Sequence, residues 1–234
     1  MNETIALRAL AGFVFVDATT NAIVTDTLDV VIPGVTLKSN RSGVFTIFDV
    51  PAARAATSAP GTFVVTVSDP ARRYLARTAT VTAPASPATA APARITLYPS
   101  PARPVAPNWA VVRASIAGAS PPNAPMPWST VQITRTSDGQ QLARGLADER
   151  GEALVAIQGL KRQTGAGADG PVTEAATPVS VTASFDTAVA GRPAGWIPDP
   201  SALRVAPDPA VKSAAASLSL APGETVFTQL SIPA

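Results

Sequence analysis

Short runs in which apolar and polar residues alternate recur along the whole sequence, and helical periodicity is nearly absent. These runs are rich in Val, Thr, Phe and Ile and are separated by Gly, Pro, Asn and Asp, which favour turns. The pattern predicts an all-β protein. We expect strands at 12–17, 35–38, 44–48, 62–68, 74–82, 94–98, 110–116, 130–135, 141–146, 152–157, 179–185 and 225–232.

A proline-rich segment divides the chain into two halves. Four of the nine residues in 99–107 are prolines, which favours an extended, semi-rigid polyproline segment that rises about 3.1 Å per residue. We therefore expect two tandem antiparallel β-sandwich domains. The first spans 1–99, the linker spans 100–108, and the second spans 109–234 with long loops rich in Pro, Gly and Ala.

Three segments have no clear strand pattern. Residues 83–93 are mainly Ala and Pro, 161–171 are rich in Gly and Ala, and 188–215 contain five prolines. The last segment is longer than the structureless loops of most compact domains. It is compatible with a binding arm, with a packed loop, or with strands hidden near Trp196 or 203–206, and we favour a structural role over a binding one.

The sequence contains no His and no Cys, and this excludes many kinds of active site. The usual zinc, haem and iron–sulfur ligand sets, Ser-His-Asp and Cys-His catalysis, and disulfides are all impossible within the chain. No nucleophile elbow and no glycine-rich phosphate loop occur. A pair of carboxylates can still hydrolyse glycosides, but such a site needs a cleft with aromatic platforms, and the chain has two Tyr. We expect no enzyme, no cofactor and no metal.

The charge and hydropathy of the sequence do not favour binding to nucleic acids or insertion into membranes. The net charge is +2, from 18 basic and 16 acidic residues, which is a poor footprint for nucleic-acid binding. No apolar run approaches the roughly 18 residues of a membrane helix. The opening MNETIALRAL lacks the regions of a signal peptide, so we expect a protein made in the cytoplasm and not exported through a cleaved leader.

Four motifs follow one another in the first half. They are GFVFVDATTNAIV from Gly12, SNRSGVF from Ser39, Val50-Pro51 followed by PGTF from Pro60, and SDP from Ser68 leading to Tyr74. Together they resemble the carboxypeptidase regulatory-like, transthyretin-like β-sandwich family over residues 10–98. A weaker second copy lies in 109–234. The resemblance implies modules that fold, space or dock other domains, generally without catalytic residues of their own.

Two pairs of residues predict hairpin turns. The Asn40 side chain can bond the backbone two residues further on, and Gly43 supplies the positive φ that closes the turn. Asp148 and Gly151 repeat this pattern in the second half. Asp148 also lies near Glu149 and Glu152, but the spacing does not match a calcium loop, so we expect a solvated turn.

Four residues are candidates for contact with a partner. Arg72, Arg73 and Arg77 flank Tyr74 in the one basic cluster that includes an aromatic residue. Such a cluster can hold phosphate or an acidic partner, with Arg72 and Arg73 as the candidates for that contact, but we favour a solvated turn. Trp128 and Trp196 lie in proline-rich loops, where a large ring on a stiff backbone suits an interface. The same rings can instead cover the open end of a sandwich.

These observations favour a non-enzymatic structural or adaptor component of a larger assembly, with other protein subunits as partners in a homo- or hetero-oligomer. A phage-tail-like or contractile injection particle assembled in the cytoplasm fits the lack of a leader. One alternative is a carbohydrate- or surface-binding module, in which Trp128 and Trp196 should share one exposed patch. Another is the accessory domain pair of an exported enzyme.

Overall fold

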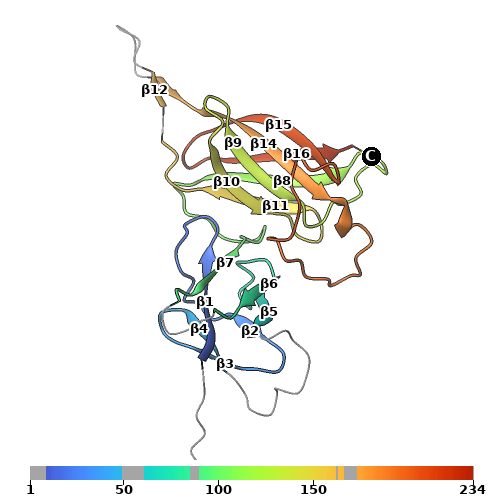
Figure 1. The fold of residues 1–234 in the computed structure, drawn as a ribbon. Helices are drawn as coiled ribbons and strands as arrows, with labels where there is room; N and C mark the ends of the chain where they lie inside the picture. Colours follow the sequence, from blue (N-terminus) through green and yellow to red (C-terminus); the bar gives the residue numbers. More distant parts are fainter. Residues whose placement is uncertain (1–8, 49–60, 85–89, 162, 166–172, 234) are drawn as a thin grey trace, which may run out of the picture.

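The structure is a computed structural model that describes residues 9–48, 61–84, 90–161, 163–165 and 173–233. Within these residues the chain is all-β, as the alternating pattern predicted, and its one helical element is the short 3₁₀ turn η2 (Thr187–Val189). The strands form two groups, one on each side of the proline-rich segment (Figure 1). We call residues 9–98 the N-terminal half and residues 109–233 the C-terminal half.

The N-terminal half contains two sheets. One has the strand order β3-β4-β1-β7 and the other β2-β5-β6. The first sheet is mixed, because β1 pairs antiparallel with β4 and parallel with β7. The strands are β1 (Ala9–Asp17), β2 (Asp29–Val31), β3 (Thr36–Ser39), β4 (Val44–Phe48), β5 (Thr62–Ser68), β6 (Arg77–Thr82) and β7 (Ala93–Leu97).

Strand β1 is central because its sequence is apolar on both faces. Phe13, Val14, Phe15 and Val16 are all buried, as expected for a strand covered on both sides. The rings of Phe13, Phe15 and Phe45 lie with centroids 5.3 to 5.5 Å apart. Side chains from both sheets meet in this one cluster, which is the arrangement of a β-sandwich.

The C-terminal half repeats the two-layer plan with longer strands. Its sheets have the orders β10-β9-β14-β15 and β11-β8-β16, and β12 and β13 form a separate pair. The strands are β8 (Ala110–Gly118), β9 (Thr130–Arg135), β10 (Gln141–Leu146), β11 (Glu152–Ile157), β12 (Gln163–Gly165), β13 (Thr173–Ala175), β14 (Thr177–Asp186), β15 (Val211–Leu220) and β16 (Thr225–Ile232).

The two halves have separate cores. The large cluster of the C-terminal half takes residues from both of its main sheets, including Ile116, Ile133, Val181 and Leu230. Among the described strands, every pairing joins two strands of the same half. The halves therefore meet through loops and side chains rather than through a shared sheet.

Six of the twelve expected strands have the expected bounds at both ends, and the other six differ at one or both ends. The largest difference concerns the segment 188–215, for which no strand was assigned, because its end forms the first residues of β15 (Val211–Leu220). Strands β2, β12 and β13 were also not expected. The motif residues Val50, Pro51 and Pro60 lie outside the described residues.

The proline-rich segment is not the extended polyproline spacer that its composition predicted. The Arg103 amide donates a 3.0 Å hydrogen bond to the Ser100 carbonyl, which closes a turn inside the segment. Val105 and Trp109 then pack on Val111, Leu154 and Ala156 of the C-terminal half. Burial of these apolar side chains outweighs the preference of the prolines for an extended path.

Candidate functional site

A buried ion pair links strand β6 to a loop of the C-terminal half. Arg77 donates from Nη2 to Oδ1 of Asp199 at 2.9 Å and to the Ser201 hydroxyl at 3.2 Å. The Arg77 side chain is 4% exposed and the Asp199 side chain 23%. Burial lowers the pKa of Arg77, although Asp199 opposes this shift by favouring the charged form. We call the segment 187–210, which carries Asp199, the bridging loop.

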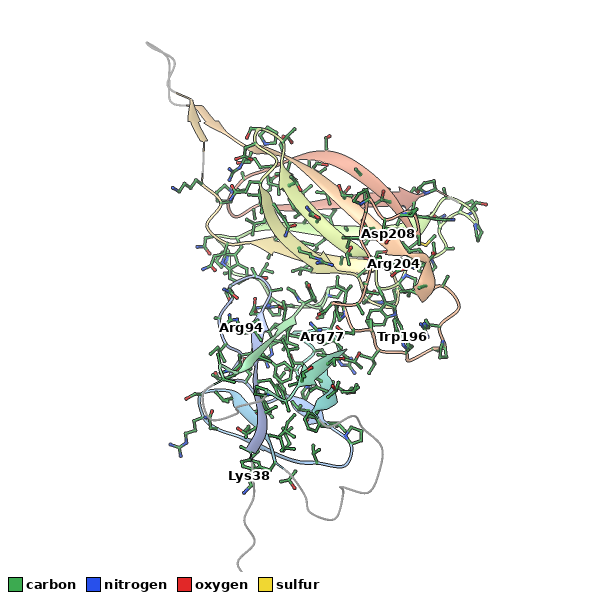
Figure 2. The ribbon with its side chains drawn as sticks, viewed as in Figure 1. Lys38, Arg77, Arg94, Trp196, Arg204 and Asp208 are labelled. Atoms are coloured by element: carbon green, nitrogen blue, oxygen red, sulfur yellow. The ribbon has the colours of Figure 1, made fainter. Side chains whose placement is uncertain are left out.

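Further hydrogen bonds fix the same contact. The amide of Thr78 donates to the Pro198 carbonyl at 2.7 Å, which joins the backbones of the two halves. Arg77 also donates from Nη1 to the Thr96 carbonyl at 2.6 Å, so its guanidinium is held on several sides. Figure 2 shows Arg77 in the N-terminal half and Trp196 in the bridging loop, which extends toward that half from the C-terminal sheets.

The bridging loop is anchored in its own half by a second ion pair. Arg204 donates from its backbone amide and its guanidinium to the carboxylate of Asp186, the residue before η2. These hydrogen bonds from Arg204, with a backbone donor from Ala188, lower the pKa of Asp186 to about 2. The loop is therefore packed at both ends, which matches the structural role favoured for 188–215.

A second buried cluster ties the proline-rich segment to the N-terminal half. The Tyr74 hydroxyl donates to Oδ2 of Asp17 at 2.7 Å, and Arg103 lies 2.5 Å from the same oxygen. The Arg103 guanidinium also lies 4.8 Å from the centroid of the Tyr74 ring. Burial raises the pKa of Asp17, but the hydrogen bonds from Arg103 and Tyr74 outweigh it and leave that pKa below its ordinary value. Burial and Asp17 raise the pKa of Tyr74.

The proline-rich segment is also held from the other side. Arg113 on β8 donates to the Pro101 carbonyl at 2.5 Å. The Ser100 amide donates to the Arg73 carbonyl at 2.9 Å, and the Ser100 hydroxyl donates to the Arg72 carbonyl at 2.5 Å. Both halves thus bind the segment by hydrogen bonds.

The structure places Arg72 and Arg73 in a turn of the N-terminal half. Arg73 forms ion pairs with Asp69 at 3.0 Å and Asp26 at 2.7 Å. Arg72 has a φ of 55°, a conformation that suits a tight turn. These contacts favour the turn interpretation of the basic cluster over the interpretation as a site for an acidic partner.

Trp128 and Trp196 line one cavity of about 710 Å³ in the C-terminal half. They are 68 positions apart in the sequence, yet both rings are partly buried in the same wall. Arg192 lies with its guanidinium 5.1 Å from the Trp196 ring centroid. Arg150 and Lys212 add two more cationic side chains, and Glu149 adds one carboxylate.

Trp109 packs elsewhere, against the outer face of β8 and β11.

The two predicted hairpin turns have similar hydrogen bonds. Oδ1 of Asn40 accepts from the amides of Ser42 and Val44, both at 3.0 Å, and Gly43 has a φ of 77°. Oδ1 of Asp148 accepts from the amides of Arg150 and Glu152 at 2.9 and 3.0 Å, and Gly151 also has a φ of 77°. The second turn supplies Glu149 and Arg150 to the cavity wall, a placement that its sequence did not indicate.

Of the junction residues, the sequence pointed only to Arg77, as part of the basic cluster around Tyr74. Asp17, Arg77, Arg103 and Asp199 are spread over the chain, and no local motif joins them. Among the described residues, no group of three acidic side chains is placed to hold a metal ion. Among the same residues, no helix is long and apolar enough to span a membrane.

The fold and the junction define an all-β protein with two cores. No family model and no curated protein matches the chain. Among solved structures, the chain is similar to the Bacillus anthracis TIE protein, with 9% identity and a TM-score of 0.30 over 96% of this chain and 34% of that one. It is also similar to the shaft pilin spaA from Lactobacillus rhamnosus GG, with 9% identity and a TM-score of 0.29 over 96% and 97% of the two chains. The chain spans about a third of the TIE protein.

Proposed function

We propose that this chain is a non-enzymatic structural component of a larger protein assembly. In this proposal it consists of two tandem β-sandwich domains, 1–99 and 109–234, held in a fixed relation by the segment 100–108 and by the bridging loop. The observation that carries the proposal is the junction in which Arg77 binds Asp199. A component that spaces or orients its neighbours needs such a fixed relation.

The contacts at the junction favour rigidity over free motion. Domains within one chain usually move relative to each other unless their interface restrains them, as a large hydrophobic interface does. Here the Arg77–Asp199 pair is buried, and the Thr78 amide binds the Pro198 carbonyl beside it. Opening the junction would expose these buried groups.

The N-terminal half is proposed as the transthyretin-like domain that its motifs resemble. Its sheets of four and three strands around one core support this assignment. Such a domain acts as a spacing or docking module, which agrees with a structural role. The kind of particle, for which we named a phage-tail-like or contractile injection system assembled in the cytoplasm, stays a prediction from the sequence.

A structural component also needs surfaces that contact its neighbours, and β16 offers one. This strand lies at the edge of its sheet and pairs, among the described strands, with β8 alone. Phe227 projects from it with 75% of its surface exposed. An unpaired edge with an exposed aromatic side chain is suited to pairing with a strand of another subunit.

The proposal is tested by the mass of the native protein from its source, measured by gentle sizing and followed by mass spectrometry of what accompanies it. We expect a large particle with defined partner subunits, and we expect Phe227→Lys to reduce incorporation while Lys38→Gln, at another exposed strand position, leaves it unchanged. A monomer of about 24 kDa without companions would contradict the proposal.

A second candidate function is a carbohydrate- or surface-binding module. The observation that favours it is that Trp128 and Trp196 line one cavity. Such a module was expected to hold both rings on one exposed patch, whereas here both are partly buried. A structural component can carry such a site, so the two candidate functions are compatible.

A further inference from the structure

The cavity between Trp128 and Trp196 has the size of a ligand site. Its volume of about 710 Å³ lies within the range of roughly 300–1,000 Å³ that small-molecule sites occupy. The walls come from three segments distant in sequence, 125–128, 149–150 and 187–196, and from the ends of β14 and β15. The rim residues Gly191, Arg192 and Ala194 are exposed, so a ligand has access from solvent.

The charges around the cavity favour an anionic ligand. Arg150 is held by Asp148, to which it donates at 3.0 and 3.1 Å. Within the described part of the chain, Arg192 makes one side-chain hydrogen bond, from Nε to the Ala188 carbonyl at 3.3 Å, and no ion pair. Lys212 is exposed and likewise has no ion pair among the described residues. Opposite these two cations, the lining contains one carboxylate, that of Glu149.

The two indole rings add flat apolar surfaces to this cationic wall. Indole rings bind other flat or weakly polar faces by stacking and attract cations to their π-systems. The Arg192 guanidinium lies over the Trp196 ring, so the cavity wall holds a cation and an indole in contact. A ligand that offers both an apolar ring face and a carboxylate therefore matches the wall better than a small inorganic anion.

The backbone of the wall is poorly suited to a peptide. Pro125, Pro127 and Pro193 line the cavity, and proline has no N–H to donate to an extended chain. Peptides that bind in extended form depend on such main-chain hydrogen bonds. At Gly191 and Gly195 the space that a Cβ would occupy is open, so a bulky ring can approach the backbone there.

We propose that this cavity binds an acidic oligosaccharide. The pyranose rings stack on Trp128 and Trp196, and the uronate carboxylates pair with Arg192 and Lys212. This inference rests on the second candidate function and adds the charge of the ligand to it. It assigns a role to Arg192 and Lys212, which the sequence analysis did not select.

The test is a titration of the full chain with trigalacturonic acid, followed by calorimetry and by indole fluorescence at low salt. Galactotriose serves as the neutral counterpart, and a pentaglutamate peptide serves as an acidic ligand without sugar rings. The variants are Trp196→Ala and the pair Arg192→Gln with Lys212→Gln. The matched controls are Arg41→Gln and Lys161→Gln, which replace exposed cations outside the cavity.

We expect saturable binding of trigalacturonic acid that weakens at least tenfold in both cavity variants and is unchanged in the controls. Galactotriose should bind at least tenfold more weakly, and added salt should reduce this difference because it screens the charges. Equal binding of the two sugars would overturn the inference but keep the carbohydrate-binding function. Binding of neither sugar would overturn both, and tighter binding of pentaglutamate would assign the cavity to an acidic peptide.

Discussion

The guanidinium of Arg77 on β6 donates a 2.9 Å hydrogen bond to the carboxylate of Asp199, which lies 122 positions further along the chain. This pair joins two halves whose cores are separate and whose described strands do not pair with each other. The bridging loop of the C-terminal half therefore acts as a clamp on the N-terminal half. The proline-rich segment forms the second connection, through Arg103 and Arg113.

Replacing Asp199 should destabilise the protein at the junction. In Asp199→Asn the buried Arg77 loses its charged partner, and a hydrogen bond to a charged group contributes up to about 3 kcal/mol. Because Arg77 keeps its bonds to the Thr96 carbonyl, we expect the free energy of unfolding to fall by about 2 kcal/mol. Chemical denaturation measures this change.

Asp138→Asn is the matched control for that variant. Asp138 pairs with Arg135 at 2.8 Å on the surface, where the side chains are 47% and 28% exposed. Exposed pairs contribute little to stability, so this variant should have a small effect. Equal losses of unfolding free energy in the two variants would mean that the buried Arg77–Asp199 pair stabilises the protein no more than an exposed pair does.

Removing the Tyr74 hydroxyl should loosen the proline-rich segment. In Tyr74→Phe the carboxylate of Asp17 loses a 2.7 Å buried hydrogen bond, which should cost about 2 kcal/mol of unfolding free energy. Tyr98→Phe removes a hydroxyl that makes no hydrogen bond within the described part of the chain and should change stability little. If both variants are neutral, the cluster of Asp17, Tyr74 and Arg103 does not stabilise the fold.

Stability should fall in acid between about pH 4 and pH 2. The hydrogen bonds of Arg204 lower the pKa of Asp186 to about 2, below the ordinary value of about 3.9 that applies to the unfolded chain. The unfolded state therefore binds more protons in this interval, so unfolding becomes easier as the pH falls. The lowered pKa values of Asp17 and Asp69 act in the same direction.

Denaturation across this pH interval measures the effect, and Asp186→Asn isolates one contribution. That variant cannot titrate at position 186, so its stability should depend less steeply on pH between 4 and 2. A slope identical to that of the unmodified protein would contradict the assignment of the lowered pKa to Asp186.

Substitutions at two glycines distinguish the cost of backbone strain from the cost of a steric clash. Gly139 and Gly151 have φ of 70° and 77°, where alanine costs about 1–2 kcal/mol. A Cβ at Gly139 would meet nothing within 4 Å, whereas at Gly151 it would lie 2.4 Å from the Ile116 carbonyl oxygen. Gly151→Ala should therefore reduce the melting temperature clearly more than Gly139→Ala. The opposite order would contradict the packing of this turn against β8.

The sequence predicted strands well where large side chains alternate. β9 (Thr130–Arg135) and β11 (Glu152–Ile157) have the expected bounds, because Val, Ile and Leu mark their buried faces. β15 (Val211–Leu220) was missed because the middle of the strand is a run of Ala, in which Ala214 and Ala216 face inward and Ala215 outward. Small residues of low strand propensity give no periodic signal, and the pairing with β14 imposes the strand.

The candidate site was predictable only in part. Trp128 and Trp196 were selected separately for their place in proline-rich loops, and only the fold brings them to one cavity. Arg77 sits in a strand whose sequence, RTATVT, gives no sign of a buried cation. Its partner Asp199 is supplied by tertiary structure, and contacts over such a separation leave no local pattern in the sequence.

The rigidity of the junction is tested most directly by distances between spin labels. Since the chain has no Cys, paired cysteines can be introduced at the exposed positions Arg41 and Ser217, one in each half, and labelled with nitroxides. A second labelled pair, at Asp138 and Ser217 in the C-terminal half, gives the reference width of the distance distribution within one half. The account predicts one narrow distance distribution between the halves, close to the reference width and broadened in Asp199→Asn. A broad distribution in the otherwise unmodified chain would show that the halves move freely and would contradict it.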